Sequence, residues 1–269
     1  ALTSGTTYVN GQYTYTYNGS TGWSVVLTDK ESTDPVTTEL CETVNDKPIV
    51  SMEVMFQDSK ATSIDLSSFD TSNVTNMYGM FQDSKVTSLD LSSFDTSKVT
   101  TMRSMFDSSA ATEIKGLENF NTSKVTKMDE MFAGTNVATL DLSSFDTSNV
   151  TGMTDMFFGS AATEIKGLEK FNTSNVTNMS GMFYNCKVAN LELSNFDTSK
   201  VTDMSWMFYQ SVATSLDLSS FDTTNVTDMS KMFYNSKATT GYARSQEDAD
   251  RFNASSNKPS GLTFVVKSS

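Results

Sequence analysis

Carboxylates are the side chains with which this chain could do chemistry, because its 269 residues include 32 Asp and Glu but no histidine. Without histidine there is no imidazole general base, no Ser-His or Cys-His nucleophile pair and no histidine-containing metal site. Acidic pairs that could serve a two-carboxylate hydrolase occur throughout the chain. None of them interrupts the regular pattern of the sequence, whereas an active site should be a local exception to it. We therefore expect no enzyme activity, no catalytic residues and no cofactor.

Two columns of polar side chains recur at fixed intervals. The first could hold calcium, but Asn replaces Asp at two of its positions and both residue types can cap a helix, so we expect capping and no metal. The second should lie on the solvent side of strands, where two lysines break a run of like charges. The first column is Asp70, Asp95, Asn121, Asp146, Asn172, Asp197 and Asp222, and the second is Asp65, Asp90, Lys115, Asp141, Lys166, Glu192 and Asp217.

Sulfur-containing side chains could bind soft metals or form a disulfide. Met-x-x-Met pairs such as Met77 and Met80 can bind Cu(I), but all 16 methionines follow one apolar pattern, which favours core packing. Cys41 and Cys186 are separated by five repeats. At the spacing of paired strands they should lie roughly 24 Å apart, too far for a disulfide.

One exposed column changes character along the chain, at the residue that follows each Met-Phe pair. Tyr and Trp are preferred anchors for binding partners, although stacked aromatic rings can equally stabilise neighbouring repeats. The column reads Gln57, Gln82, Asp107, Ala133, Phe158, Tyr184, Tyr209 and Tyr234. We predict a binding site at its aromatic half, Phe158, Tyr184, Tyr209 and Tyr234, together with Trp206.

A repeat of about 25 residues must position these columns. Met-Phe recurs from Met55 to Met232, and most phenylalanines fall in two columns. Within one unit, Leu89 and Leu91 alternate with Asp90, which predicts a short strand. The spacing from Val99 to Phe106 is that of one face of a short helix. No unit can bury its apolar face alone, so the units should stack.

The expected architecture is an α/β solenoid over residues 49–241, with about eight coils and right-handed connections between parallel strands. Two units carry one extra residue beside a glycine, at Gly116 and Gly167, where we expect a bulge. Residues 1–48 should form a β-hairpin cap, and residues 242–269 a helix and strand that cap the other end. Ser245 starts a sequence typical of a capping box.

The pattern Val86-x-x-Leu89-x-Leu91-x-x-Phe94 resembles the core of leucine-rich repeats. The longer string L-D-L-S-S-F-D-T-S-N-V-T-x-M-x-x-M-F resembles the repeat of BspA-like bacterial surface proteins, over about 190 residues. This resemblance implies a leucine-rich-repeat solenoid at the bacterial cell surface with a role in adhesion or host interaction. It supplies no catalytic residues.

The net charge of −13 argues against binding to nucleic acid or to anionic membranes. No run of 18 apolar residues is present, so we expect no membrane insertion in this fragment, which begins without an initiator Met or signal peptide. We expect a monomeric, extracellular module that binds a host or bacterial surface protein or glycan. The alternatives are a structural spacer, a hydrolase that uses two carboxylates, and ice binding by the threonines Thr71, Thr96, Thr122, Thr147, Thr173, Thr198 and Thr223.

Overall fold

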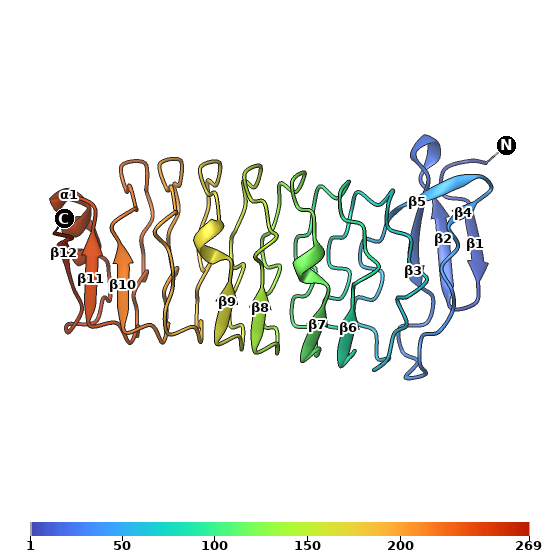
Figure 1. Ribbon diagram of the computed structural model, residues 1–269, viewed down its shortest axis with the longest axis horizontal. Coiled ribbons are helices and arrows are strands. Elements are labelled where there is room, and N and C mark those ends of the chain that lie inside the picture. The colour runs from blue at the N-terminus through green and yellow to red at the C-terminus, as the bar shows by residue number, and fades with distance from the viewer. Residues whose placement is uncertain (1, 269) are drawn as a thin grey trace.

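The computed structural model describes residues 2–268 as an elongated solenoid. Its coils stack side by side along the long axis, between a small sheet at the N-terminal end and a helix at the C-terminal end (Figure 1). A chain of parallel bridges runs from Ser51–Asn76 to Asp203–Asp228 and joins each coil to the next. The prediction that the repeats stack into a solenoid is therefore confirmed.

Short parallel strands pair neighbouring coils on one side of the solenoid. The pairs are β6 (Ser88–Asp90) with β7 (Glu113–Lys115), β8 (Thr139–Asp141) with β9 (Glu164–Lys166), and β10 (Ser215–Leu218) with β11 (Thr240–Ala243). Equivalent residues of successive repeats are in register, as Leu89 is with Ile114. This register keeps each residue type in one column along the molecule.

The prediction of a helix in every coil is wrong. The one α-helix within residues 2–268 is α1 (Gln246–Asn253), outside the repeats. In each coil the segment around Met-Phe is a series of β-turns, in which alternate N–H groups bond inside the coil and across to the next one. Met105 donates to the carbonyl of Met102 (3.2 Å), whereas Phe106 donates to Met131 of the following coil (3.0 Å). Turns closed three residues back give the same apolar spacing as a helix, which explains the misleading pattern.

Two positions in every coil have left-handed backbone, and these positions end any helix. One is the residue before Met-Phe and the other is four residues later. The first column is Val54, Gly79, Ser104, Glu130, Asp155, Gly181, Trp206 and Lys231, and the second is Asp58, Asp83, Ser108, Gly134, Gly159, Asn185, Gln210 and Asn235.

The core consists of stacked identical side chains. The Met and Phe columns are buried, apart from the partly buried Met229. Rings of successive coils lie nearly parallel, with centroids 5.5 Å apart for Phe56 and Phe81. Beside them the threonines considered for ice binding are also buried. Thr71 illustrates their role, since its hydroxyl donates to the carbonyl of Asp95 and accepts from the N–H of Asp95, both at 2.8 Å. These threonines join coils and cannot form an exposed array.

The extra residue of the longer coils forms a tight helical turn in place of the expected bulge. The 3-10 helices η2 (Leu117–Asn119) and η3 (Leu168–Lys170) follow Gly116 and Gly167. Gly116 has φ +94°, and a Cβ there would stand 2.6 Å from the carbonyl carbon of Leu91. Glycine is therefore required at this point for both its backbone angle and its lack of a side chain.

A five-stranded sheet closes the N-terminal end of the core, in the order β1-β2-β3-β5-β4. Its strands are β1 (Thr7–Asn10), β2 (Tyr13–Tyr17), β3 (Trp23–Leu27), β4 (Thr43–Val44) and β5 (Lys47–Ser51), with the short 3-10 helix η1 (Gly19–Thr21) between β2 and β3. Tyr13, Tyr15 and Trp23 are fully buried beneath this sheet. They cover the apolar surface that the first coil would otherwise expose.

The C-terminal end is closed by α1 and by β12 (Thr263–Val266), which pairs parallel with β11. Ser245 is the N-cap of α1, and its side chain accepts a hydrogen bond from the N–H of Asp248. Cys41 and Cys186 are free thiols, and burial raises the pKa of Cys186 to about 11. Among the helices of residues 2–268, none has the length and apolarity needed to span a bilayer.

Candidate functional site

Four aromatic rings form a continuous stack along the C-terminal half of the solenoid. This aromatic ladder consists of Phe158, Tyr184, Tyr209 and Tyr234. Successive ring centroids are 4.2, 4.4 and 5.0 Å apart, and the rings are tilted by only 17°, 8° and 23°. The structure thus brings together the side chains that the sequence singled out.

Trp206 lies beside the ladder. Its ring centroid is 6.2 Å from that of Tyr184 and 5.1 Å from that of Tyr209. The ammonium of Lys231 lies 4.6 Å from the Trp206 ring centroid, a cation–π contact. A β-turn holds the two side chains together, in place of the expected helical turn. It is closed by a hydrogen bond from the N–H of Tyr209 to the carbonyl of Trp206.

The stacking determines what the aromatic ladder can present to a partner. Because each inner ring has another ring on both sides, the faces of Tyr184 and Tyr209 are largely covered, and the ring edges are left to meet a ligand. Phe158, at the N-terminal end, remains 39% exposed. The ladder is therefore a narrow apolar strip of ring edges.

In the first coils the same column is a chain of amide hydrogen bonds. The Gln57 amide donates to Gln82, and the Gln82 amide donates to the Asp107 carboxylate, each at 3.0 Å. The buried side chain of Ala133 separates this polar chain from Phe158. The column thus consists of two stacks: a polar one, whose side chains hydrogen-bond to one another, and an aromatic one, whose rings pack on one another.

A hollow of about 440 Å³ adjoins the ladder. Gly181 lies in the column between Asp155, one coil before it, and Trp206, one coil after it, and the Asp155 carboxylate extends into the space that a Gly181 side chain would take. Phe158 and Tyr184 contribute the aromatic side of the lining. The remaining lining residues are Asp155, Ser180, Gly181, Ser205 and Trp206.

Asp155 is the exceptional group in the hollow. It is half-buried, and its carboxylate has no hydrogen-bond or ion-pair partner among residues 2–268. Burial, followed by repulsion from the neighbouring acids, raises the pKa of Asp155 to about 6. Those acids are Glu130, Asp129, Asp107 and Asp203.

Each of the neighbouring acids does have a donor. Glu130 accepts from the Ser104 hydroxyl (2.8 Å), and Asp203 accepts from the N–H and hydroxyl of Ser205 (2.8 and 2.7 Å). The other two are bonded likewise: Asp129 accepts from the Thr154 N–H, and Asp107 from Ser108 and Gln82. An unpaired, partly buried carboxylate is costly, and such groups cluster at functional sites.

The repeats of this solenoid match a known protein family. Residues 32–115, 107–165 and 151–257 each match the family described as "Mycoplasma protein of unknown function, DUF285". The chain belongs to the DUF285 family. That description assigns no activity, and the finer BspA-like leucine-rich-repeat assignment is not confirmed.

No curated protein matches this DUF285 chain. Among solved structures, "The Crystal structure of Pneumococcal vaccine antigen PcpA" is similar at 12% identity with a TM-score of 0.38. The alignment covers 98% of this chain and 86% of that one. A likeness this weak carries no argument about fold or function.

The two polar columns of the DUF285 chain have local structural roles. Asp70 accepts from the N–H of Ser72 (2.9 Å), and Asn121 accepts from the N–H of Ser123 (3.1 Å). Both are Asx turns, which correct the expected helix caps and explain why Asp and Asn are interchangeable. Asp65 of the second column makes the same turn with Ser67, and Lys115 pairs with Glu113 at 3.6 Å.

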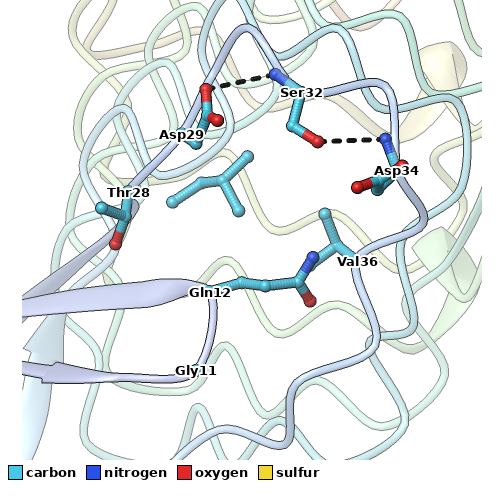
Figure 2. A pocket seen from close by; sticks show the side chains of 8 residues that line it. Gly11, Gln12, Thr28, Asp29, Ser32, Asp34 and Val36 are labelled. Atoms are coloured by element: carbon cyan, nitrogen blue, oxygen red, sulfur yellow. Dashed lines mark hydrogen bonds between the residues drawn. The ribbon is translucent and has the colours of Figure 1, made fainter.

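A second cavity, of about 290 Å³, lies in the N-terminal region between the turn that joins β1 to β2 and the loop that follows β3 (Figure 2). Several of its polar groups hold the shape of that loop. Asp29 accepts from the N–H of Ser32 (3.2 Å), Ser32 accepts from the N–H of Asp34 (3.1 Å), and Gln12 donates to the carbonyl of Pro35 (3.0 Å). The Asp34 carboxylate has no partner among residues 2–268, but it is exposed to solvent, whereas Asp155 is half-buried.

Sequence reasoning identified the ladder but missed Asp155 and Gly181. The signal was present in the column before Met-Phe, where acid, glycine and tryptophan follow one another in successive coils. The sequence alone does not show that the side chains of this column lie beside those of the ladder. That neighbourhood follows from the left-handed turns of the backbone, which the sequence pattern does not reveal.

Proposed function

We propose that this DUF285 chain is a binding module of a bacterial surface protein and acts through the aromatic ladder and the adjoining hollow. The observation that carries the proposal is the asymmetry of one column, which is polar in the first coils and aromatic in the last four. All coils share the same Met and Phe columns, which are buried except for the partly buried Met229 of the last coil. The ladder is therefore an addition to the core.

A protein is the partner class that the ladder favours. Sugars bind aromatic residues through ring faces, and here the faces of the inner rings are covered by other rings. A strip of ring edges suits the mixed apolar and polar surface of a protein, for which Tyr and Trp are frequent anchors. The sequence resemblance supports a location of the module and its partner outside the cell.

A glycan is the second candidate partner, supported by a polar groove of about 680 Å³ in the same coils. Asn185, Gln210 and Asn235 line it, next in sequence to the three tyrosines of the ladder. Their amides can donate to and accept from sugar hydroxyls. An enzymatic role has no such support, and a spacer of eight coils would extend only about 40 Å.

Binding to arrays of bacterial and host surface proteins and of glycans tests the proposal. We expect a ligand whose binding is lost when Tyr184→Ala and Tyr209→Ala are combined. The matched control combines Gln57→Ala and Gln82→Ala, which alters the same column in the first coils. Equal binding by the tyrosine variant and the parent protein, or no ligand on any array, would favour the spacer.

A further inference from the structure

We infer that the hollow between Asp155 and Trp206 is a receptor for the cationic side chain of a lysine or arginine on a basic segment of the partner protein. This inference rests on the proposed binding function and names the chemistry that the site recognises. It commits to a charged peptide ligand, whereas a neutral glycan is an outcome that the test must separate.

The shape of the hollow suits a single cationic side chain. The Asp155 carboxylate lies at the Cβ position of Gly181, one coil before Trp206, which leaves roughly 5 Å along the solenoid between the carboxylate and the coil of Trp206. Charge-assisted hydrogen bonds to a carboxylate are about 2.8 Å long. An ammonium already lies 4.6 Å from the Trp206 centroid, that of Lys231. A cation between Asp155 and Trp206 can therefore contact both.

The charges around the hollow favour a cation. Asp155 has no partner among the described residues, while the acids nearest to it, Glu130, Asp129, Asp107 and Asp203, are hydrogen-bonded and add negative potential. Lys231 is in contact with Trp206 but forms no ion pair with Asp155. A basic side chain would supply the partner that Asp155 lacks.

The lining adds a polar side that suits a guanidinium as well as an ammonium. Ser180 and Ser205, each two residues before the second Met of its coil, also line the hollow. The Ser205 hydroxyl is bonded to Asp203. The Ser180 hydroxyl makes no hydrogen bond with residues 2–268, so it can accept one from a ligand.

Titration with hexalysine, and with the same peptide acetylated on every lysine side chain, tests the inference on the whole chain. Trp206 reports binding through its fluorescence, because the other tryptophan, Trp23, is fully buried at the far end. We expect hexalysine to bind and the acetylated peptide not to bind. Asp155→Asn keeps the side-chain shape and should weaken binding by about tenfold, as expected for loss of a charged hydrogen bond.

The control is Asp146→Asn, which makes the same change of charge at an exposed Asx turn, in a column where Asn occurs naturally. Its affinity should equal that of the parent protein after correction for net charge at two salt concentrations. Affinity should also fall between about pH 7 and pH 5 in the parent protein, because the pKa of Asp155 is about 6, and not in Asp155→Asn.

The outcomes separate this inference from the proposed function. Equal loss of affinity in Asp155→Asn and Asp146→Asn would show that only net charge attracts the peptide, and would overturn the inference. Binding of the acetylated peptide would overturn it too. If the arrays reveal a neutral glycan or an uncharged protein surface that needs Tyr184 and Tyr209 but not Asp155, the inference fails while the binding function stands.

Discussion

The carboxylate of Asp155 occupies the space in which Gly181, one coil further along, would carry its Cβ. Gly181 also has φ +62°, so two independent constraints require glycine there. The contact leaves Asp155 beside backbone that offers it no hydrogen bond, since the N–H of Gly181 donates to the carbonyl of Ser205 (2.9 Å). A partly buried carboxylate without a hydrogen-bond donor lowers the stability of the folded protein. Its presence here therefore indicates a role in binding and not in folding.

Asp155→Asn should stabilise the protein at neutral pH. Because folding raises the pKa of this carboxyl from 3.8 to about 6, the native state retains a proton between about pH 4 and pH 6 that the unfolded chain has released. The free energy of unfolding therefore falls as pH rises through this window. The gain in the variant at pH 7 should be about 1 kcal/mol, a value reduced for the partial exposure of the group.

Urea unfolding of Asp155→Asn and the parent protein at about pH 7 and about pH 4 measures this effect. The difference should be present at the higher pH and absent at the lower one, where Asp155 is protonated. A difference that is equal at both pH values would mean that the substitution acts through packing and not through charge.

Gly181→Ala should destabilise the protein by about 2 kcal/mol, because alanine is strained in left-handed backbone and its Cβ would displace the Asp155 side chain. The same substitution in an Asp155→Ala background should cost less, since only the backbone term remains. A double-mutant cycle measures this coupling. Additive costs would contradict the close contact between the two residues.

The period of the sequence was enough to predict a stacked solenoid, because identical side chains at about 25-residue intervals can be buried only against their own copies. The helix was mispredicted since Met102, Met105 and Phe106 have a spacing common to helices and successive β-turns. Ser104 and Ser108, whose φ values are both 54°, carry the turn, and serine gives no sequence signal for that angle.

The aromatic ladder was predictable for the same reason as the solenoid: residues in one column must be neighbours. The hollow could not be predicted, because it depends on how the column before Met-Phe approaches the column after Met-Phe across a β-turn. Trp206 and Tyr209 would have been neighbours on a helix as well as on a β-turn. Asp155 and Trp206 line one hollow, and the glycine in the coil between them leaves room for the Asp155 carboxylate to extend toward Trp206.

Tyr209→Ala should lower the free energy of unfolding by about 2 kcal/mol, because its ring stacks on Tyr184 at 4.4 Å and on Tyr234 at 5.0 Å. Tyr209→Phe keeps the ring and should leave stability within about 0.5 kcal/mol of the parent. Thermal melts of both variants provide the measurement. If Tyr209→Phe nevertheless loses ligand affinity, the hydroxyl belongs to the binding surface.

Val54→Asn should raise stability by about 1 kcal/mol. Val54 has φ +52°, which is strained for a β-branched residue, and asparagine tolerates this angle better. The opposite kind of substitution, Asn185→Val at another left-handed position with φ +50°, should destabilise the protein. Paired chemical denaturation of the two variants decides the matter, and a loss of stability in Val54→Asn would mean that valine packing outweighs backbone strain.

Asp248 should make the C-terminal cap sensitive to acid. Burial alone would raise its pKa, but hydrogen bonds from Ser245, Thr223 and Arg244 outweigh burial and lower it to about 2. The resulting stabilisation, about 2 kcal/mol, is complete above about pH 4 and is lost as pH falls toward 2. Asp248→Asn should remove this pH dependence of stability and make the amides of α1 accessible to hydrogen exchange at neutral pH.

The control Asp250→Asn, at an exposed position of the same helix, should have neither effect. If the amides of α1 and of the last coil exchange equally slowly in Asp248→Asn and in the parent protein, this carboxylate does not hold the cap against the solenoid.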